Sequence, residues 1–270
     1  MVIINNMKKL LILLIIFAIF GPVFILGYLG FIPGLSTLLG ANRPRDLGIK
    51  YTQDDLKSCR SKSHVEYTSL PDSSSSSQTR QFSGQREVTA EFTSTEITAT
   101  MNNQPWHFWP YQNVQVKFNA DGSGEISGAL IKERIPSYAE TIGIPKEAAD
   151  FAMKFLPAKP VFYVKMKAAL TDNKVSVFEP QALQIGRLPM PLSLFLSFKG
   201  PQLINAAFAQ DIGEMSQELS KVQNKKALII GYINSRLSSA FGNFYAKKAY
   251  PGENKLFFEG ILSEKISYTP

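Results

Sequence analysis

The sequence has little of what builds disulfide-stabilised folds and reactive sites. Its 270 residues include one cysteine, Cys59, and two histidines, His64 and His107. A chain with a single cysteine cannot form an internal disulfide, so its fold has to depend on the burial of apolar side chains. Cys59 also lacks the small neighbours of a lipoprotein cleavage site, and we interpret it as an incidental thiol in a linker.

Motifs with recognisable chemistry are missing as well. The sequence has no HExxH zinc motif, no His/Cys cluster and no G-x-S-x-G loop that would present a serine to His107. The glycines of GSGEISG, which begins at residue 122, lie in a predicted hairpin turn with no helix behind them, so we expect no phosphate-binding loop. These absences favour a protein that is not an enzyme and that holds no metal or cofactor.

Charge is absent from a long N-terminal stretch. No charged residue occurs between Leu10 and Gly40, and Lys8 and Lys9 stand directly before it. Because about 20 apolar residues in a helix cross the hydrocarbon core of a bilayer, residues 10–29 can form a membrane anchor. The lysines predict a cytoplasmic N-terminus and an extracytoplasmic body.

The alternative for this stretch is a cleaved export signal. Its apolar core would suit one, but no small-x-small cleavage site follows closely, and the apolar character continues past Pro22. We therefore favour an uncleaved single-pass anchor, and both routes export the rest of the chain. Residues 31–39 are expected to lie at the membrane interface.

The positive charge of the chain is not concentrated. The net charge is +7, and beyond the first residues the lysines form only pairs such as Lys225–Lys226 and Lys247–Lys248. Such pairs are shorter than the basic runs that bind anionic lipid or nucleic acid. We expect no nucleic-acid partner. The export segment and the lack of N-glycosylation sequons fit a bacterial envelope protein.

The chain divides into three predicted regions, which are a membrane anchor at 1–40, a juxtamembrane stalk or linker at 41–83 and an extracytoplasmic domain at 84–270. Within the stalk, TQDDLKSC predicts a short helix that Thr52 caps, with Asp54 and Asp55 in its first turn. Five consecutive serines at 73–77 predict a flexible spacer.

The domain opens with a strand and a helix. Apolar residues alternate in REVTAEF, which begins at residue 86, and this alternation predicts a half-buried strand. Thr93 and Glu96 follow with the spacing of a capping box, and Ile97 and Met101 lie one helical turn apart. A short helix is expected there.

Hairpins dominate the remainder of the domain. Each combines alternating apolar residues with a pair of turn residues, and the three predicted turns are Asp121–Gly122, Asp172–Asn173 and Pro251–Gly252. Three such hairpins predict a meandering antiparallel sheet.

Helical periodicity appears between the second and third hairpins. From Ile204 to Val222 the apolar residues are three or four apart, which predicts a long amphipathic helix, and a shorter helix is expected after Pro145. An amphipathic helix needs an apolar surface, and the sheet offers one. The expected fold class is α+β: an N-terminal transmembrane helix, then a curved antiparallel sheet packed around one long helix and shorter helices.

One apolar run remains, LPMPLSLFLSF from Leu188 to Phe198. Its 11 residues are too few to span a bilayer, and Pro189 and Pro191 exclude a continuous helix or a central strand. The run therefore lines either a core or a pocket. With the aromatic cluster WHFWP it supplies the candidate ligand-binding residues, which are Trp106, Phe108, Trp109, Leu192, Phe195, Phe198 and Phe208. Packing in the core is the favoured alternative for both sets.

The order of these parts resembles the YpmS-type family of membrane-anchored bacterial proteins. The matching motifs are T-S-T-E-I-T at 93–98, the N-A-D-G hairpin, I-G-x-L-P-x-P at 185–191 and INSRL near the end of the last helical stretch. The resemblance covers roughly residues 85–265. It implies a sheet curled about a helix, of the kind found in exported lipid-handling proteins, and it supplies no catalytic residues.

The expected function is a non-catalytic binding module for a lipid or another apolar ligand at the cell envelope. The alternative is an envelope scaffold or protein-interaction domain with a solid core and no ligand, and an enzyme of unrecognised type is a third hypothesis. Empty apolar volume distinguishes the first two, because a ligand needs a pocket whereas an ordinary core leaves almost none.

Overall fold

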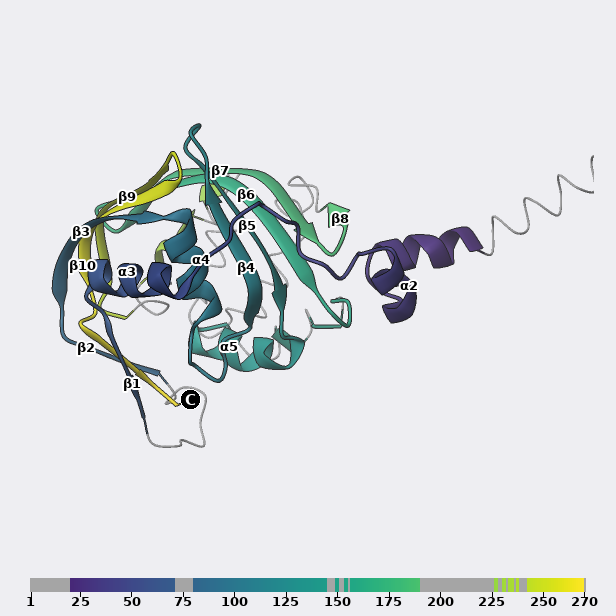
Figure 1. The fold of residues 1–270 in the computed structure, drawn as a ribbon, viewed down its shortest axis with the longest axis horizontal. Helices are drawn as coiled ribbons and strands as arrows, with labels where there is room; N and C mark the ends of the chain where they lie inside the picture. The colour runs from purple at the N-terminus through teal and green to yellow at the C-terminus, as the bar shows by residue number, and fades with distance from the viewer. Residues whose placement is uncertain are drawn as a thin grey trace, which may run out of the picture.

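The computed structural model describes residues 20–70, 80–144, 156–189 and 242–269, together with a few residues at 149–154 and 226–237. It has an α+β fold in which an antiparallel sheet curls into a half-barrel around helices (Figure 1). This confirms the α+β class and the curved antiparallel sheet. The long helix predicted from Ile204 to Val222 and the run after Pro189 lie outside the described residues.

The main sheet has eight strands, and its backbone path runs in the order β3-β10-β9-β6-β5-β4, with β7 beside β6 and β8 beside β7. The strands are β3 (Arg86–Thr93), β4 (Tyr111–Phe118), β5 (Ser123–Leu130), β6 (Val161–Thr171), β7 (Lys174–Ile185), β8 (Leu188–Pro189), β9 (Tyr245–Gly252) and β10 (Lys255–Leu262).

The sheet forks at β6. One edge of β6 pairs with β7 along residues 162–171. The other edge pairs with β5 along residues 161–167 and with β9 only at Leu170 and Thr171. Two arms therefore diverge from the same edge of β6: β5 with β4, and β9 with β10 and β3.

Helix α4 (Ser94–Asn102) joins the two arms, because it connects β3 to β4 and lies against the outer edge of β4. Its residues Ser94, Thr98 and Asn102 are four apart and point at the backbone of β4. Thr98 Oγ1 exchanges hydrogen bonds with Val116 N and O, and the Asn102 amide does the same with Val114. A polar helix face thus takes the place of a neighbouring strand and covers the sheet edge.

Two of the three predicted turns are confirmed. Asp172 and Asn173 both have positive φ, at 48° and 58°, and β6 and β7 pair on either side of them. The predicted position of the third turn is wrong by two residues, because the turn lies at Glu253–Asn254. Pro251 instead pairs with Leu256 within the ladder, and Asn254 takes the left-handed conformation with a φ of 57°.

Both predicted helix caps are confirmed. Helix α3 (Gln53–Ser63) begins with a capping box between Thr52 and Asp55, and α4 begins with one between Thr93 and Glu96. The structure also contains a short 3₁₀ helix, η2 (Lys132–Arg134), and helix α5 (Ile135–Thr141), which the sequence patterns did not predict.

The predicted stalk contains parts of the folded domain. Strand β1 (Glu66–Ser69) pairs parallel with the last strand, β11 (Lys265–Tyr268), and β2 (Arg80–Ser83) pairs antiparallel with it. Cys59 of α3 is 6% exposed and packs with apolar residues of the main sheet, so it is not an incidental linker thiol. The serine run at 73–77 lies outside the described residues.

The segment before α3 crosses the outer face of the sheet. The backbone N–H groups of Leu47 and Ile49 both donate to Gln115 Oε1 on β4, at 2.8 and 3.2 Å. The guanidinium of Arg45 lies 4.1 Å from the ring centre of Tyr163 on β6. Residues 45–49 therefore bind to the domain, where the sequence had predicted a free linker.

The inner face of the sheet is apolar. Val114, Val116 and Phe118 of β4 pack against Ile97 and Met101 of α4. In the other arm, a second cluster combines Cys59 with the inward-facing apolar residues Val88, Phe92, Ala246 and Phe258. Burial of these two clusters on either side of α4 holds the helix within the half-barrel.

The N-terminal part of the structure is helical at residues 20–28 and again in α2 (Pro33–Leu38). Among the residues that the structure describes, no helix has the length and apolar character needed to cross a bilayer. Residues 1–19, which include half of the predicted anchor, lie outside that part of the chain.

Candidate functional site

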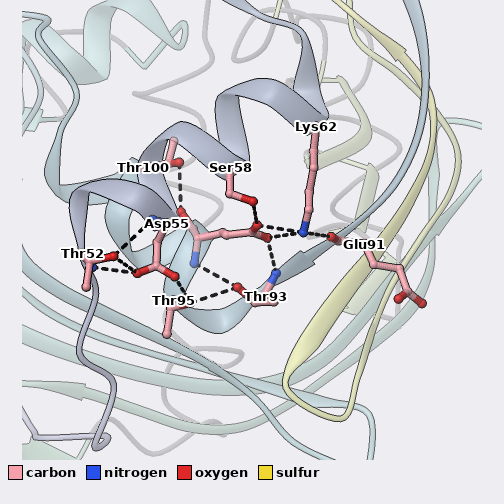
Figure 2. Close-up of polar contacts among 9 residues, drawn as sticks. Thr52, Asp55, Ser58, Lys62, Glu91, Thr93, Thr95 and Thr100 are labelled. Atoms are coloured by element: carbon pink, nitrogen blue, oxygen red, sulfur yellow. Dashed lines mark hydrogen bonds and ion pairs between the residues drawn. The ribbon is translucent and has the colours of Figure 1, made fainter.

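A buried polar site lies between α3 and α4 and centres on Glu96, which is 3% exposed. Figure 2 shows its partners Ser58, Lys62 and Thr93 converging on this site. Lys62 Nζ lies 2.7 and 2.9 Å from the two carboxylate oxygens of Glu96. Ser58 donates to Oε1, and the backbone N–H of Thr93 donates to Oε2 at 2.8 Å. Both oxygens of Glu96 are therefore satisfied by α3 and by its own helix cap.

These contacts set the ionisation of Glu96. Burial alone raises the pKa of its carboxyl group, but the hydrogen bonds from Lys62, Ser58 and the Thr93 backbone outweigh burial. The pKa of Glu96 consequently lies below its usual value, and the side chain is a carboxylate at neutral pH.

Asp55 extends the same network. Thr95 donates to its Oδ1 at 2.6 Å, and the backbone and hydroxyl of Thr52 both donate to Oδ2 at 2.7 Å. The bonds from Thr95 and Thr52 hold the pKa of Asp55 below its usual value. Two helix caps are thereby bonded to each other's helices, and the arrangement acts as a structural joint rather than as a site with a free acid or base.

The aromatic candidates Trp106, Phe108 and Trp109 are brought together, but in a packed cluster. Trp106 is 2% exposed, and its ring meets Phe108 edge-on with 6.2 Å between ring centres. Trp109 meets both Tyr111 and Tyr138 edge-on, at 4.9 and 5.9 Å, and its indole N–H donates to the carbonyl of Met101. The structure therefore packs Trp106 and Trp109 against aromatics of α5 and β4, and Phe108 against Trp106.

The other four candidates cannot be placed. Leu192, Phe195, Phe198 and Phe208 all lie outside the described residues. Their assignment to a pocket stays a prediction.

An apolar hollow of about 190 Å³ lies at the fork of the sheet. The described residues that line it are apolar side chains, prolines or glycines from both arms and from β6, namely Val116, Phe118, Gly124, Ile126, Val164, Met166, Ala168, Pro251 and Leu256. Trp106, Phe108 and Trp109, the predicted pocket residues that the structure describes, do not belong to this lining. The hollow follows from the topology, because β5 and β9 leave the same edge of β6 in different directions.

Small residues keep the hollow open. Gly124 lies opposite Phe118 on β4 and Met166 on β6, and Ala168 follows on the same face of β6. A Cβ atom added at Gly124 would come no closer than 3.8 Å to the Phe118 ring. The sequence feature that could have indicated the hollow is therefore the presence of small residues at inward-facing positions of β5 and β6. Prediction of the strands alone gives such residues no meaning.

Neither histidine belongs to a site. His64 ends α3 with a φ of 54°, and the His107 ring lies edge-on to Phe108 at 5.2 Å. Within the described ranges, no group of three or more His, Cys, Asp or Glu side chains could hold a metal ion. Burial raises the pKa of the Cys59 thiol, which disfavours the nucleophilic thiolate.

With this geometry in place, the chain was compared with known proteins, and no protein-family model, curated protein or solved structure matches it. The resemblance to the YpmS-type family stays a prediction from the quoted motifs.

Proposed function

We propose that this protein is a membrane-anchored, extracytoplasmic binding module that holds the hydrocarbon part of a lipid or another apolar molecule. The observation that carries the proposal is the hollow at the fork of the sheet, where the nine lining residues that the structure describes are apolar or glycine and none is charged. Apolar surface that is left unfilled in a fold gains free energy when a hydrocarbon covers it.

The size of the hollow limits what it can take. A dry apolar cavity of about 150 Å³ accommodates benzene, whereas sites for whole drug-sized ligands measure roughly 300–1,000 Å³. At about 190 Å³ the hollow suits one short hydrocarbon segment. The ligand is therefore an alkyl chain whose end enters the hollow while its polar group stays outside.

The exposed apolar side chains of the N-terminal region support the proposed location at a membrane. Eight of the thirteen large apolar side chains that the described residues expose lie between residues 20 and 38. They continue the uncharged stretch that begins at Leu10, after Lys8 and Lys9. A lipid environment accounts for this exposure, and we place the domain outside the bacterial cell membrane with its N-terminus in the cytoplasm.

The proposal is tested with a fatty acid that carries a photoreactive diazirine near its chain end. The full-length protein is reconstituted in liposomes with this probe, irradiated and mapped by peptide mass spectrometry. We expect labelling on β6 and β10 at the lining residues, such as Met166 and Leu256. Ala168→Leu and Gly124→Val, which fill the hollow from two strands, should remove most of that labelling.

The matched control is Ala169→Leu, which adds the same side chain one residue later on the opposite face of β6. It should leave the labelling unchanged. Labelling that both Leu variants preserve, or a wild-type protein that is labelled only between residues 10 and 40, would contradict the proposal. The latter result would favour the scaffold with a solid core.

A further inference from the structure

Residues 20–40 form a compact helical hairpin. The Ser36 hydroxyl donates to the carbonyl of Gly27 at 2.8 Å, and the Leu35 side chain packs on Gly27 so closely that no Cβ would fit there. The backbone N–H of Phe31 donates to the carbonyl of Leu26 at the turn between the two helices. α2 therefore folds back on the helix before it and does not continue its direction.

The hairpin is docked on one end of the sheet. Gly186, in the turn between β7 and β8, lies against Leu29, and a Cβ atom at residue 186 would come within 2.6 Å of the Leu29 carbonyl oxygen. Arg187 donates to the carbonyl of Gly40 at 3.1 Å, and its guanidinium lies 5.9 Å from the ring centre of Tyr28. Pro157, just before β6, faces Gly30.

The outer side of the hairpin is apolar. Phe31 is 41% exposed and Leu38 is 82% exposed, although no charged residue occurs between Leu10 and Asn42 to keep this segment in water. Arg43, Arg45 and Arg187 flank it. Apolar side chains beside arginines are typical of a segment at the headgroup boundary, where the rings and aliphatic groups enter the acyl region and the guanidinium groups meet lipid phosphates.

We propose that α2 lies in the outer membrane–water interface and that its docking on the sheet holds the domain in one fixed orientation, with Pro157, Gly186 and Arg187 facing a bilayer that contains anionic lipid. This inference rests on the anchor of the proposed function. The domain is thereby a rigid attachment instead of a body on a flexible tether.

In this orientation an apolar row on β6 and β7 leads from the bilayer side of the domain toward the hollow. The start of β6 is at the docked end, and with a rise of about 3.3 Å per residue Val164 lies about 10 Å beyond Val161. Phe162 pairs with Ile185 and Val164 pairs with Leu183, so an apolar row leads from the docked end toward the hollow. An alkyl chain that leaves the bilayer along this row would meet apolar side chains.

The test measures membrane depth with single nitroxide labels on the full-length protein in liposomes of phosphatidylcholine and phosphatidylglycerol, with Cys59→Ala as background. Labels are placed by Phe31→Cys, Leu38→Cys, Ile15→Cys and Val177→Cys. We expect labels 31 and 38 to collide with oxygen more than with a water-soluble nickel chelate, at a depth of roughly 5–10 Å. Label 177, on the exposed part of β7, should be in water.

Label 15 separates the two proposals. If label 15 is in lipid and label 38 is in water, the anchor stands and the interfacial helix is refuted. If both are in water, the anchor fails and the inference fails with it.

Fixed orientation is tested by the distance between label 177 and gadolinium-labelled lipid headgroups. The wild-type protein should give one narrow distribution, and Arg187→Ala should broaden it without changing the depth of label 38. Lys159→Ala, which removes the same charge at the same end of the sheet, is the control and should change neither. A broad wild-type distribution contradicts the fixed orientation.

Discussion

The joint between α3 and α4 and the hollow at the fork of the sheet differ in how completely their groups are paired or packed. In the joint, both carboxylate oxygens of Glu96 and both of Asp55 accept hydrogen bonds. In the hollow, Gly124 and Ala168 leave about 190 Å³ unfilled beside Met166. The two carboxylates of the joint are thus paired within the fold, whereas the hollow leaves apolar surface of the described residues uncovered.

The difference also has an energetic side. Buried polar groups are costly unless they are paired, so the joint specifies one geometry for α3 and α4. Side chains that line an unfilled apolar space lack dispersion contacts on that side, and they gain such contacts only when a molecule enters the space. This contrast supports the proposal that the hollow binds a hydrocarbon.

Removal of the Glu96 carboxylate should give the largest effect. Glu96→Ala leaves Ser58, Lys62 and the Thr93 N–H without their acceptor, and we expect a loss of about 2–3 kcal/mol in the free energy of unfolding. Chemical denaturation of the full-length protein in detergent measures it. Glu91→Ala removes an exposed carboxylate that pairs with Lys255, and it should cost at most about 0.5 kcal/mol. Equal losses would refute the role of the joint.

Acid should weaken the joint and leave the hollow unchanged. Because the pKa of Glu96 is lower in the folded protein than its usual value of 4.5, its contribution is present above pH 4.5 and is lost as pH falls through the folded pKa. The stability difference between wild type and Glu96→Gln should therefore shrink as pH is lowered from 5 to 3 in denaturation experiments. A constant difference would mean that Glu96 is not held as a carboxylate.

The smallest effects should distinguish the hollow from the packed layer beside it. At Gly128 an added Cβ would lie 3.0 Å from both Phe162 and Val114, so Gly128→Ala should cost about 1 kcal/mol or more. Gly124→Ala meets only ordinary contacts, and it should stabilise the strand by about 0.5 kcal/mol. Thermal unfolding of both variants measures the opposite signs, and destabilisation by both would mean that no free space lies at residue 124.

Local features of this fold could be predicted, and features that depend on distant pairing could not. The caps at Thr52 and Thr93 and the Asp172–Asn173 turn are encoded within a few residues, and all three are confirmed. The Pro251–Gly252 turn failed because Pro-Gly is a strong local turn signal that the register of β9 with β10 overrides. The stalk interpretation failed for the same reason, since β1 finds its partner β11 almost 200 residues away.

The candidate site shows the same limit. The aromatic cluster predicted a pocket at Trp106 and Trp109, yet large rings fill space, and here both pack on Tyr138. The hollow depends on what is missing from Gly124 and Ala168, and on a fork that only the pairing of β6 with both β5 and β9 creates. A pattern of single residues contains no information about that fork.

The most direct test of the account is native mass spectrometry of the full-length protein released from detergent after expression in bacteria. We predict that the wild-type protein and Ala169→Leu each carry one apolar molecule, and that Ala168→Leu carries none. A wild-type protein without a bound molecule, or one that Ala168→Leu retains to the same extent, would contradict the claim that the hollow at β6 binds a hydrocarbon chain.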